Sequence, residues 1–144
     1  MNIASILATK GDKVVTVRAE QSIREALGLL AQHNIGALVV VDESRRPVGM
    51  LSERDVVRTA VKNEAVFTQK VSDLMTRNLI LGAPGDDLGA VGSTMVERRI
   101  RHLPVIDGGK LVGIVTIGDI VKAQRDQFQG EVDTLQTIVM EQGR

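Results

Sequence analysis

The sequence has no cysteine, tryptophan or tyrosine, and only two phenylalanines and two histidines in 144 residues. The absence of cysteine excludes disulfides, thiolate nucleophiles and cysteine-based zinc sites. Two histidines, His33 and His102, are too few for an imidazole metal cage, so we expect no metal site. Phe67 and Phe128 alone cannot form the stacking platform that single-stranded nucleic acid requires. The core must therefore consist of aliphatic side chains.

An excess of one charge and long apolar runs are also missing. Basic residues (Lys and Arg) and acidic residues (Asp and Glu) each number 18, so no overall field attracts the chain to DNA or to an anionic membrane. The longest apolar run, residues 37–41, is too short to cross a bilayer, and the N-terminus lacks the apolar stretch of a signal peptide. We therefore expect a cytoplasmic protein that binds neither membrane nor nucleic acid.

The two halves of the chain resemble each other. Residues 35–42 (IGALVVVD) align with residues 100–107 (IRHLPVID), and residues 48–57 (VGMLSERDVV) align with residues 112–121 (VGIVTIGDIV). Glycine, hydroxyl and aspartate positions stay in step, which indicates an internal duplication. The segments before each half also match, in the pairs Ile3 with Val71, Ile6 with Leu74 and Leu7 with Met75.

Each half predicts the order strand, helix, strand, strand, helix. Apolar runs bounded by turn residues predict the strands at residues 14–17, 37–41, 48–51, 79–81, 103–106 and 111–115. Ser22 with Glu25 predicts a capping box at the first helix, Asp87 precedes the corresponding helix of the second half, and the closing helices begin at Ser52 and Thr116. The expected organisation is an α/β (α+β) fold with one repeat in residues 1–62, a second in residues 63–126 and a helical tail in residues 127–144.

The tail carries its own pattern. Gly130 is expected to interrupt the helix-prone run. After it, an apolar stripe follows at helical spacing: Val132, Leu135, Ile138 and Val139. Such a stripe either caps the body of the protein or packs against a second chain, and the sequence leaves both alternatives open.

The recurring motif is Gly49-x-x-Ser52-x-x-Asp55, repeated as Gly113-x-x-Thr116-x-x-Asp119. A hydroxyl residue followed three positions later by an acid is a helix cap, and this explanation alone accounts for both pairs. The same geometry also suits a ligand, because a helix N-terminus attracts phosphate and a carboxylate one turn inside can accept hydrogen bonds from the two hydroxyls of a ribose.

These motifs, the duplication and the stretch HLPVID at residues 102–107 resemble the cystathionine-β-synthase (CBS) domain, which occurs as tandem pairs called Bateman modules. The resemblance extends from about Ile3 to Lys122. It implies two β-α-β-β-α repeats packed by pseudo-two-fold symmetry. It also implies clefts between the sheets for adenosine compounds (AMP, ADP, ATP, NAD(H) or S-adenosylmethionine), homodimers, and regulation of a partner protein that the sequence does not name.

Carried over position by position, the resemblance implies two ligand clefts. In one, Thr116 and Asp119 would bind the ribose while aliphatic side chains enclose the base. The expected residues of this first cleft are Thr116, Asp119, Ile114, Arg101, His102, Val15, Ile35 and Gly36. The expected residues of the second cleft are Ser52, Asp55, Arg54, Met50, Ile80, Ile100 and Thr76. Arg54 aligns with Gly118, so we expect the two clefts to be unequal.

The basic cluster Arg98, Arg99, Arg101 and His102 has two explanations. It can be a solvated helix end, where positive charge is favourable, or Arg101 and His102 can capture a phosphate.

The sequence thus favours a regulatory nucleotide-binding module that is not an enzyme. It contains no phosphate-binding P-loop, no dinucleotide fingerprint, no thiol and no histidine-carboxylate group with metal spacing. The alternatives are a structural or interaction dimer without a nucleotide ligand, in which both motifs are only caps, and an accessory protein of nucleotide metabolism.

Overall fold

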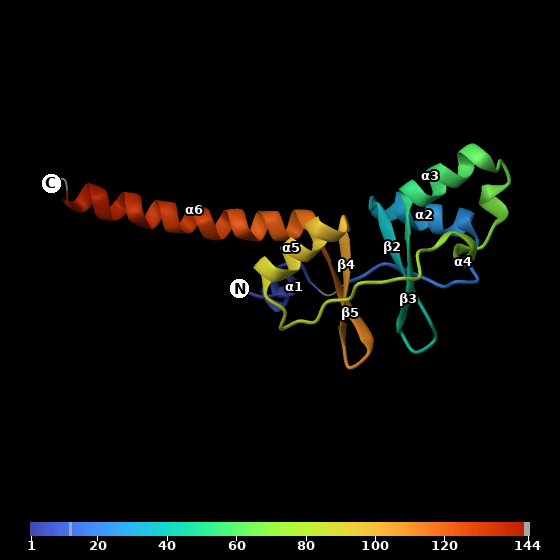
Figure 1. Cartoon of the computed structure of the whole chain (residues 1–144), viewed down its shortest axis with the longest axis horizontal. Coiled ribbons are helices and arrows are strands. Elements are labelled where there is room, and N and C mark those ends of the chain that lie inside the picture. Colours follow the sequence, from blue (N-terminus) through green and yellow to red (C-terminus); the bar gives the residue numbers. More distant parts are fainter. Residues whose placement is uncertain (12, 143–144) are drawn as a thin grey trace.

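The structure is a computed structural model that describes residues 1–142 except residue 12, and the side chains of residues 131–142 lie outside the description. Two units of the same design lie next to each other along the long axis of the molecule (Figure 1). Repeat 1 contains β1 (Thr16–Val17), α2 (Ile23–His33), β2 (Ala37–Val41), β3 (Pro47–Ser52) and α3 (Glu53–Lys62). Repeat 2 contains α5 (Leu88–Arg98), β4 (His102–Asp107), β5 (Lys110–Thr116) and α6 (Ile117–Gln142).

The strands of the two repeats pair in the same way. In repeat 1, β1 is parallel to β2 and β2 is antiparallel to β3. In repeat 2, β4 is antiparallel to β5, and Gly82 forms a parallel bridge to Val105 in the place that β1 takes in repeat 1. This arrangement confirms the expected α/β fold of two β-α-β-β-α units.

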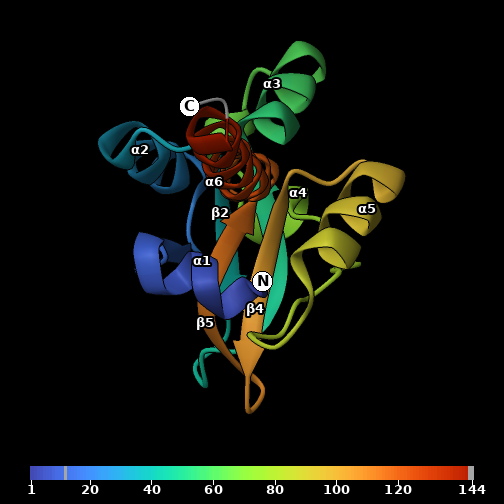
Figure 2. The ribbon, with the colours of Figure 1, turned by 90° about the vertical axis from the view of Figure 1, so that its left-hand side faces the viewer.

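The helical segments that precede the repeats are exchanged between them. α1 (Ile3–Lys10) contributes Ile3 and Ile6 to the core of repeat 2, together with Leu88 and Met95 of α5. Its first residues are held by hydrogen bonds from the amides of Ile3 and Ala4 to the carbonyls of residues 86 and 84. Figure 2 shows α1 and α5 on the two sides of the β4–β5 hairpin. The N-terminal helix thus completes the C-terminal repeat.

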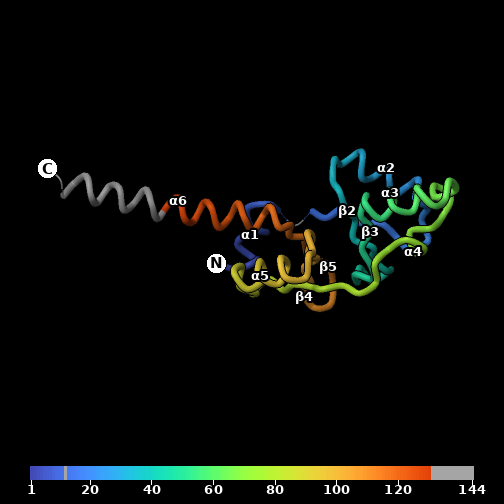
Figure 3. Tube along the Cα trace, turned by 45° about the horizontal axis from the view of Figure 1, so that its top comes forward, coloured from blue at the N-terminus to red at the C-terminus, as the bar shows by residue number. Residues whose placement is uncertain are grey.

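The reciprocal exchange builds repeat 1. The 3₁₀ turn η1 (Val66–Thr68) and the short helix α4 (Val71–Leu74) follow α3, and they place Val66, Val71 and Met75 in the core of repeat 1. Two connections cross between the repeats, one after α1 and one after α4 (Figure 3). Because burial of aliphatic surface is the main stabilising term in a core without aromatic rings, the two repeats depend on each other for stability.

A third apolar cluster joins the two sheets at the centre of the molecule. Val39 and Val41 from β2 meet Leu111 from β5, with the partly buried Val14, Met50 and Ile114 around them. Each repeat also contains an equivalent backbone hydrogen bond of 2.9 Å at the start of its last helix. In repeat 1 the Glu53 amide donates to the Gly36 carbonyl, and in repeat 2 the Ile117 amide donates to the Arg101 carbonyl.

Three local expectations need correction. Residues 79–81 do not form a strand, because sheet contact begins only at Gly82, whose amide donates to Pro104 O and whose carbonyl accepts from the Ile106 amide. The predicted strand at residues 14–17 is shorter and covers Thr16–Val17. Ser22 is the N-cap of α2 as expected, but the capping box is incomplete, because the Glu25 carboxylate accepts from the Ser22 hydroxyl and the Gln21 amide group instead of a backbone amide.

Gly130 does not interrupt the last helix, since α6 runs from Ile117 to Gln142. One glycine in a helix interior costs only about 1 kcal/mol relative to alanine, which a long helix tolerates. The predicted stripe of Val132, Leu135, Ile138 and Val139 lies outside the described side chains, so its packing partner stays a prediction. No helix in the described part of the chain has the length and hydropathy needed to cross a bilayer.

Candidate functional site

Both hydroxyl-acid pairs of the repeated motif form reciprocal helix caps. The Ser52 hydroxyl accepts from the Asp55 amide at 3.2 Å, and the Ser52 amide donates to Asp55 Oδ2 at 3.1 Å. The same two bonds between Thr116 and Asp119 measure 3.0 and 2.9 Å. The capping explanation is therefore correct for both motifs. It does not exclude a ligand, because a carboxylate has about four lone-pair positions and the cap uses one of them.

A cleft of about 300 Å³ lies between the two repeats, at the N-terminal end of α6. It gathers much of the set that the sequence predicts for the first site: Val15, Ile35, Gly36, His102, Ile114 and Thr116. Repeat 1 supplies the first three of these residues and repeat 2 the others. Lys10, Lys13, Val14 and Ala37 complete the lining. A volume near 300 Å³ is at the lower end of the usual range for small-molecule sites, about 300–1,000 Å³.

The lining of this cleft contains both aliphatic and polar residues. Val15, Ile35 and Ile114 are partly buried and come from opposite repeats, so a flat apolar group can fit between them. The polar lining consists of the Thr116 hydroxyl, the His102 imidazole and the ammonium groups of Lys10 and Lys13. Among the described residues that line it, none is acidic. The cleft thus combines aliphatic and basic residues.

Asp119 is not among the residues that line this cleft but lines a neighbouring cavity, and Lys10, which lines both, forms an ion pair with it. Lys10 Nζ is 2.7 Å from Asp119 Oδ2 and also donates to the Ile114 carbonyl at 3.0 Å. Partial burial alone would raise the pKa of Asp119, but hydrogen bonds from Lys10 and the Thr116 backbone outweigh it and lower the pKa below its ordinary value. Asp119 is therefore an ionised acceptor.

His102 also lines the cleft, and its lowered pKa keeps its imidazole neutral at pH 7. Burial, together with the positive charges of Lys10 and Arg101, lowers its pKa. Arg101 itself is exposed and is not among the residues that line the cleft. Of the predicted phosphate-facing pair, the structure thus places His102 in the cleft and Arg101 next to it.

The residues predicted for the second cleft are less closely gathered. Met50 and Thr76 are paired through two backbone hydrogen bonds of 3.0 and 2.8 Å, and Ser52 and Asp55 are paired through the cap. Arg54 is exposed in the first turn of α3. Ile100 packs against the core of repeat 2, as does Ile80, which also lines a separate cavity of about 230 Å³ with residues of α5. The second site, and the expected inequality of the two sites, stay predictions.

Lys10 is one of four lining residues that the sequence analysis does not single out, with Lys13, Val14 and Ala37. No local pattern marks it, and Lys13 is the only other lysine in the first 61 residues. The duplication aligns the two preceding segments, but only their exchange brings Lys10 to the motif of the other repeat. That exchange is a tertiary property, and it would be recognisable in sequence only through covariation of Lys10 with Asp119.

The fold and the cleft define a class of protein: a tandem pair of β-α-β-β-α modules with a candidate small-molecule site between them. The family model described as "CBS domain" matches residues 4–62 and 71–126. The chain belongs to the CBS domain family, and it carries two such domains.

Relatives of similar length support this assignment. The CBS domain-containing protein YhcV of Bacillus subtilis is 37% identical over 123 residues, which cover 85% of this chain and 86% of YhcV. Other relatives are longer, and the chain spans 39% and 34% of the length of two of them.

Solved structures share the fold over nearly their whole length. A CBS-domain-containing protein from Agrobacterium tumefaciens superposes with a TM-score of 0.81 at 38% identity, covering 86% of this chain and 99% of that one. The CBS domain pair of protein MJ0100, solved in complex with 5-methylthioadenosine and S-adenosyl-L-methionine, superposes with a TM-score of 0.77 at 29% identity, covering 88% of this chain and 98% of that one.

Proposed function

We propose that this protein is a regulatory module, not an enzyme, that binds an adenosine-containing ligand between its two CBS domains and thereby modulates a partner protein. The cleft at the N-terminus of α6 is the observation that carries the proposal, because its lining combines aliphatic residues from both repeats with two lysines. The candidate ligands are AMP, ADP, ATP, NAD(H) and S-adenosylmethionine. The relative MJ0100, crystallised with two adenosine compounds, supports this choice of ligand class.

The chemistry of the cleft suits each part of an adenosine compound. The base would lie between Val15, Ile35 and Ile114, where an aromatic heterocycle buries apolar surface. The ribose hydroxyls would donate to the ionised carboxylate of Asp119, assisted by the Thr116 hydroxyl. Phosphate groups would bind to Lys10, Lys13 and His102.

A ligand that bridges the two repeats can regulate by changing their relative arrangement. The segment before each repeat completes the core of the other one: α1 packs in repeat 2 and α4 in repeat 1. A shift between the repeats therefore also moves these helices. A ligand that prefers one arrangement would shift the population towards it, and a bound partner or second copy would sense the change.

The first test is a thermal-shift panel on nucleotide-free protein with AMP, ADP, ATP, NAD, NADH and S-adenosylmethionine, with GMP as the control. A ligand at 100 times its dissociation constant stabilises the folded state by about 2.7 kcal/mol, which the method resolves. We expect stabilisation by at least one adenosine compound and none by GMP. Asp119→Asn should weaken that binding about tenfold or more, because a hydrogen bond to a charged acceptor is lost.

The alternative is an interaction dimer in which Ser52 and Thr116 serve only as caps. The complete caps in the ligand-free structure favour it. It predicts a flat panel, and a flat panel from well-folded protein would overturn the proposed function. Survival of full affinity in the double variant Asp55→Asn with Asp119→Asn would instead overturn the assignment of the two carboxylates.

A further inference from the structure

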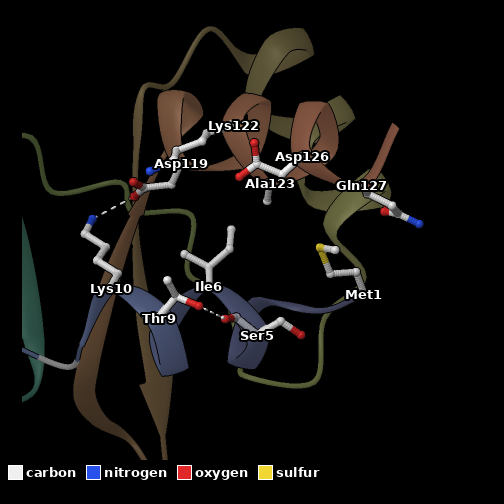
Figure 4. A pocket seen from close by; sticks show the side chains of 10 residues that line it. All are labelled: Met1, Ser5, Ile6, Thr9, Lys10, Asp119, Lys122, Ala123, Asp126 and Gln127. Carbon is white, nitrogen blue, oxygen red and sulfur yellow. Dashed lines mark hydrogen bonds and ion pairs between the residues drawn. The ribbon is translucent and has the colours of Figure 1, made fainter. Parts of the chain in front are cut away.

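The last helix, α6, has one side packed on the body of the protein and one side exposed. On the packed side, Ile120 is buried in the core of repeat 2. The α6 residues Asp119, Lys122, Ala123, Asp126 and Gln127 line a cavity of about 460 Å³ that they share with α1 (Figure 4). Val121 and Phe128 belong to neither group, and their side chains are 57% and 65% exposed. α6 therefore carries two large apolar side chains on a face that the described part of the chain leaves exposed.

These two side chains begin a longer apolar pattern. Val121 and Phe128 are seven residues apart, which is close to two helical turns, so they lie on the same side of α6. In the sequence the pattern continues at Val132, Leu135 and Val139, in alternating steps of four and three residues. We call these five residues the seam. Steps of three and four are typical of a coiled coil, in which apolar residues occupy positions a and d of a heptad.

The position of α6 disfavours the body of the same chain as the partner of the seam. The helix is continuous from Ile117 to Gln142, so the chain does not turn back at Gly130. Its described part leads away from repeat 1 and past α5 in Figure 1. The second CBS domain match ends at residue 126, and the rest of α6 adds about 24 Å at 1.5 Å per residue. Of the two alternatives that the sequence leaves open, packing against a second chain is therefore favoured.

The residue types in the seam favour a second copy of this chain. A β-branched residue at position a with leucine at d favours a parallel pair of helices, and residues 132, 135 and 139 are valine, leucine and valine. The preceding a position is Arg125, whose side chain is 69% exposed and pairs with Asp126. A single polar residue at a specifies register and the number of helices at a cost in stability. Two identical seams match in register, so a second copy supplies an apolar partner at each apolar position.

We propose that the seam of α6 packs against the seam of a second copy in a parallel two-stranded coiled coil over residues 121–142. The second half of α6 is thus a dimerisation element, and the pairing brings the two copies of repeat 2 next to each other. Neither Val121 nor Phe128 lines the ligand cleft, so the proposal does not depend on the proposed function.

Analytical ultracentrifugation of the full chain over a range of concentrations tests the seam. We expect a reversible monomer–dimer equilibrium, because three heptads make a short coiled coil. Val132→Asp combined with Leu135→Asp should raise the dimer dissociation constant at least about a hundredfold, since unpaired charges would be buried. The matched control is Thr134→Asp combined with Thr137→Asp, which adds the same charge on the side away from the seam. Its dissociation constant should stay within about twofold of the wild type.

A single cysteine tests the orientation of the pair, because the chain has no cysteine of its own. Residue 142 follows Leu135 by seven residues and takes the next d position. In a parallel pair the two thiols of Gln142→Cys therefore meet, and a mild oxidant should join them in a disulfide between the two chains. Thr137→Cys, on the side away from the seam, should cross-link much less. An antiparallel pair places the two copies of residue 142 at opposite ends and should not cross-link.

Each outcome decides the proposal. A wild type that stays monomeric at every concentration overturns it and leaves the seam to a different partner. Dimers that persist in the Val132→Asp, Leu135→Asp variant overturn it too, because the contact then lies elsewhere on the body. Equal dissociation of the control shows an effect of charge alone and has the same consequence. The Gln142→Cys cross-link leaves the apolar seam intact, so it decides the case if the aspartate variant folds poorly. No outcome involves a nucleotide, so the proposed function is tested separately.

Discussion

Leu7 lies directly on the backbone of Gly113, so closely that a Cβ atom at Gly113 would be 2.7 Å from Leu7 Cδ2. The equivalent pair in the other repeat is Met75 on Gly49, with 2.6 Å from such a Cβ to the Met75 sulfur. The motif glycines are thus required for packing, because the segment that precedes one repeat rests on the last strand of the other, β3 or β5. Neither glycine has a positive φ.

Alanine at Gly113 should therefore lower the free energy of unfolding by about 1–3 kcal/mol through overpacking. Gly49→Ala should cost more, because its Cβ would also lie 3.1 Å from the Thr76 carbonyl, which cannot rotate away as a side chain can. Denaturant unfolding measures both. Gly28→Ala is the control: nothing lies within 4 Å of its Cβ, and it should be neutral or stabilising.

A double-mutant cycle tests the contact itself. Leu7→Ala removes the carbon atoms that meet the new Cβ, so the double variant with Gly113→Ala should be less destabilised than the sum of the two single changes. Additive effects would show that the loss in Gly113→Ala has another origin.

The sequence was sufficient to predict the order of most elements, the duplication and the caps at Ser52 and Thr116. Each of these depends on local pattern or on alignment of the two halves: Ser52 and Thr116 are caps because of residues three positions later. Six residues predicted for the first site line one cleft, and their role in ligand binding stays a prediction. The aliphatic wall followed from the resemblance to the CBS family, which places Val15 and Ile35 opposite Ile114.

The exchange of the preceding segments could not be predicted, because the paired positions Ile3 and Val71 have the same apolar character and fit either core. The role of Lys10 was missed for the same reason. The strand at residues 79–81 was wrong because its apolar residues suit either a strand or a loop that packs on a core, and Ile80 does the latter. Local pattern thus identifies elements, while the choice of packing partner is decided by tertiary contacts.

Loss of the Thr116 hydroxyl should destabilise the protein without removing the motif carboxylate. Thr116→Ala deprives the Asp119 amide of its acceptor, and loss of such a cap costs about 0.5–2 kcal/mol. Ser52→Ala should cost a similar amount at α3. Urea unfolding measures both, and Thr116→Ser should retain most of the wild-type stability because it keeps the hydroxyl. Equal losses in the alanine and serine variants would contradict the cap as the cause.

Protonation of His102 should make stability decrease in mildly acidic solution. Burial, Lys10 of α1 and the neighbouring Arg101 lower its folded pKa below the ordinary value of 6.5, against the opposing effect of Asp119 on α6. Below pH 6.5 the unfolded chain therefore binds more protons than the folded one, so stability falls as the pH decreases towards the folded pKa. Unfolding curves from pH 8 to pH 5 should show a smaller decrease for His102→Gln. The control is His33→Gln, which removes an exposed imidazole.

Protonation of Asp119 should remove a second contribution in stronger acid. Its folded pKa lies below the ordinary value of 3.8, so the unfolded chain takes up the proton first. The stabilisation by Lys10 and the cap is therefore fully present above this range and is lost as the pH falls through the folded pKa. The stability difference between wild type and Asp119→Asn should shrink below pH 4. The control is Asp107→Asn, which changes an exposed carboxylate at the end of β4. A difference that persists undiminished to pH 3 would mean that the Lys10–Asp119 pair does not stabilise the folded protein in solution.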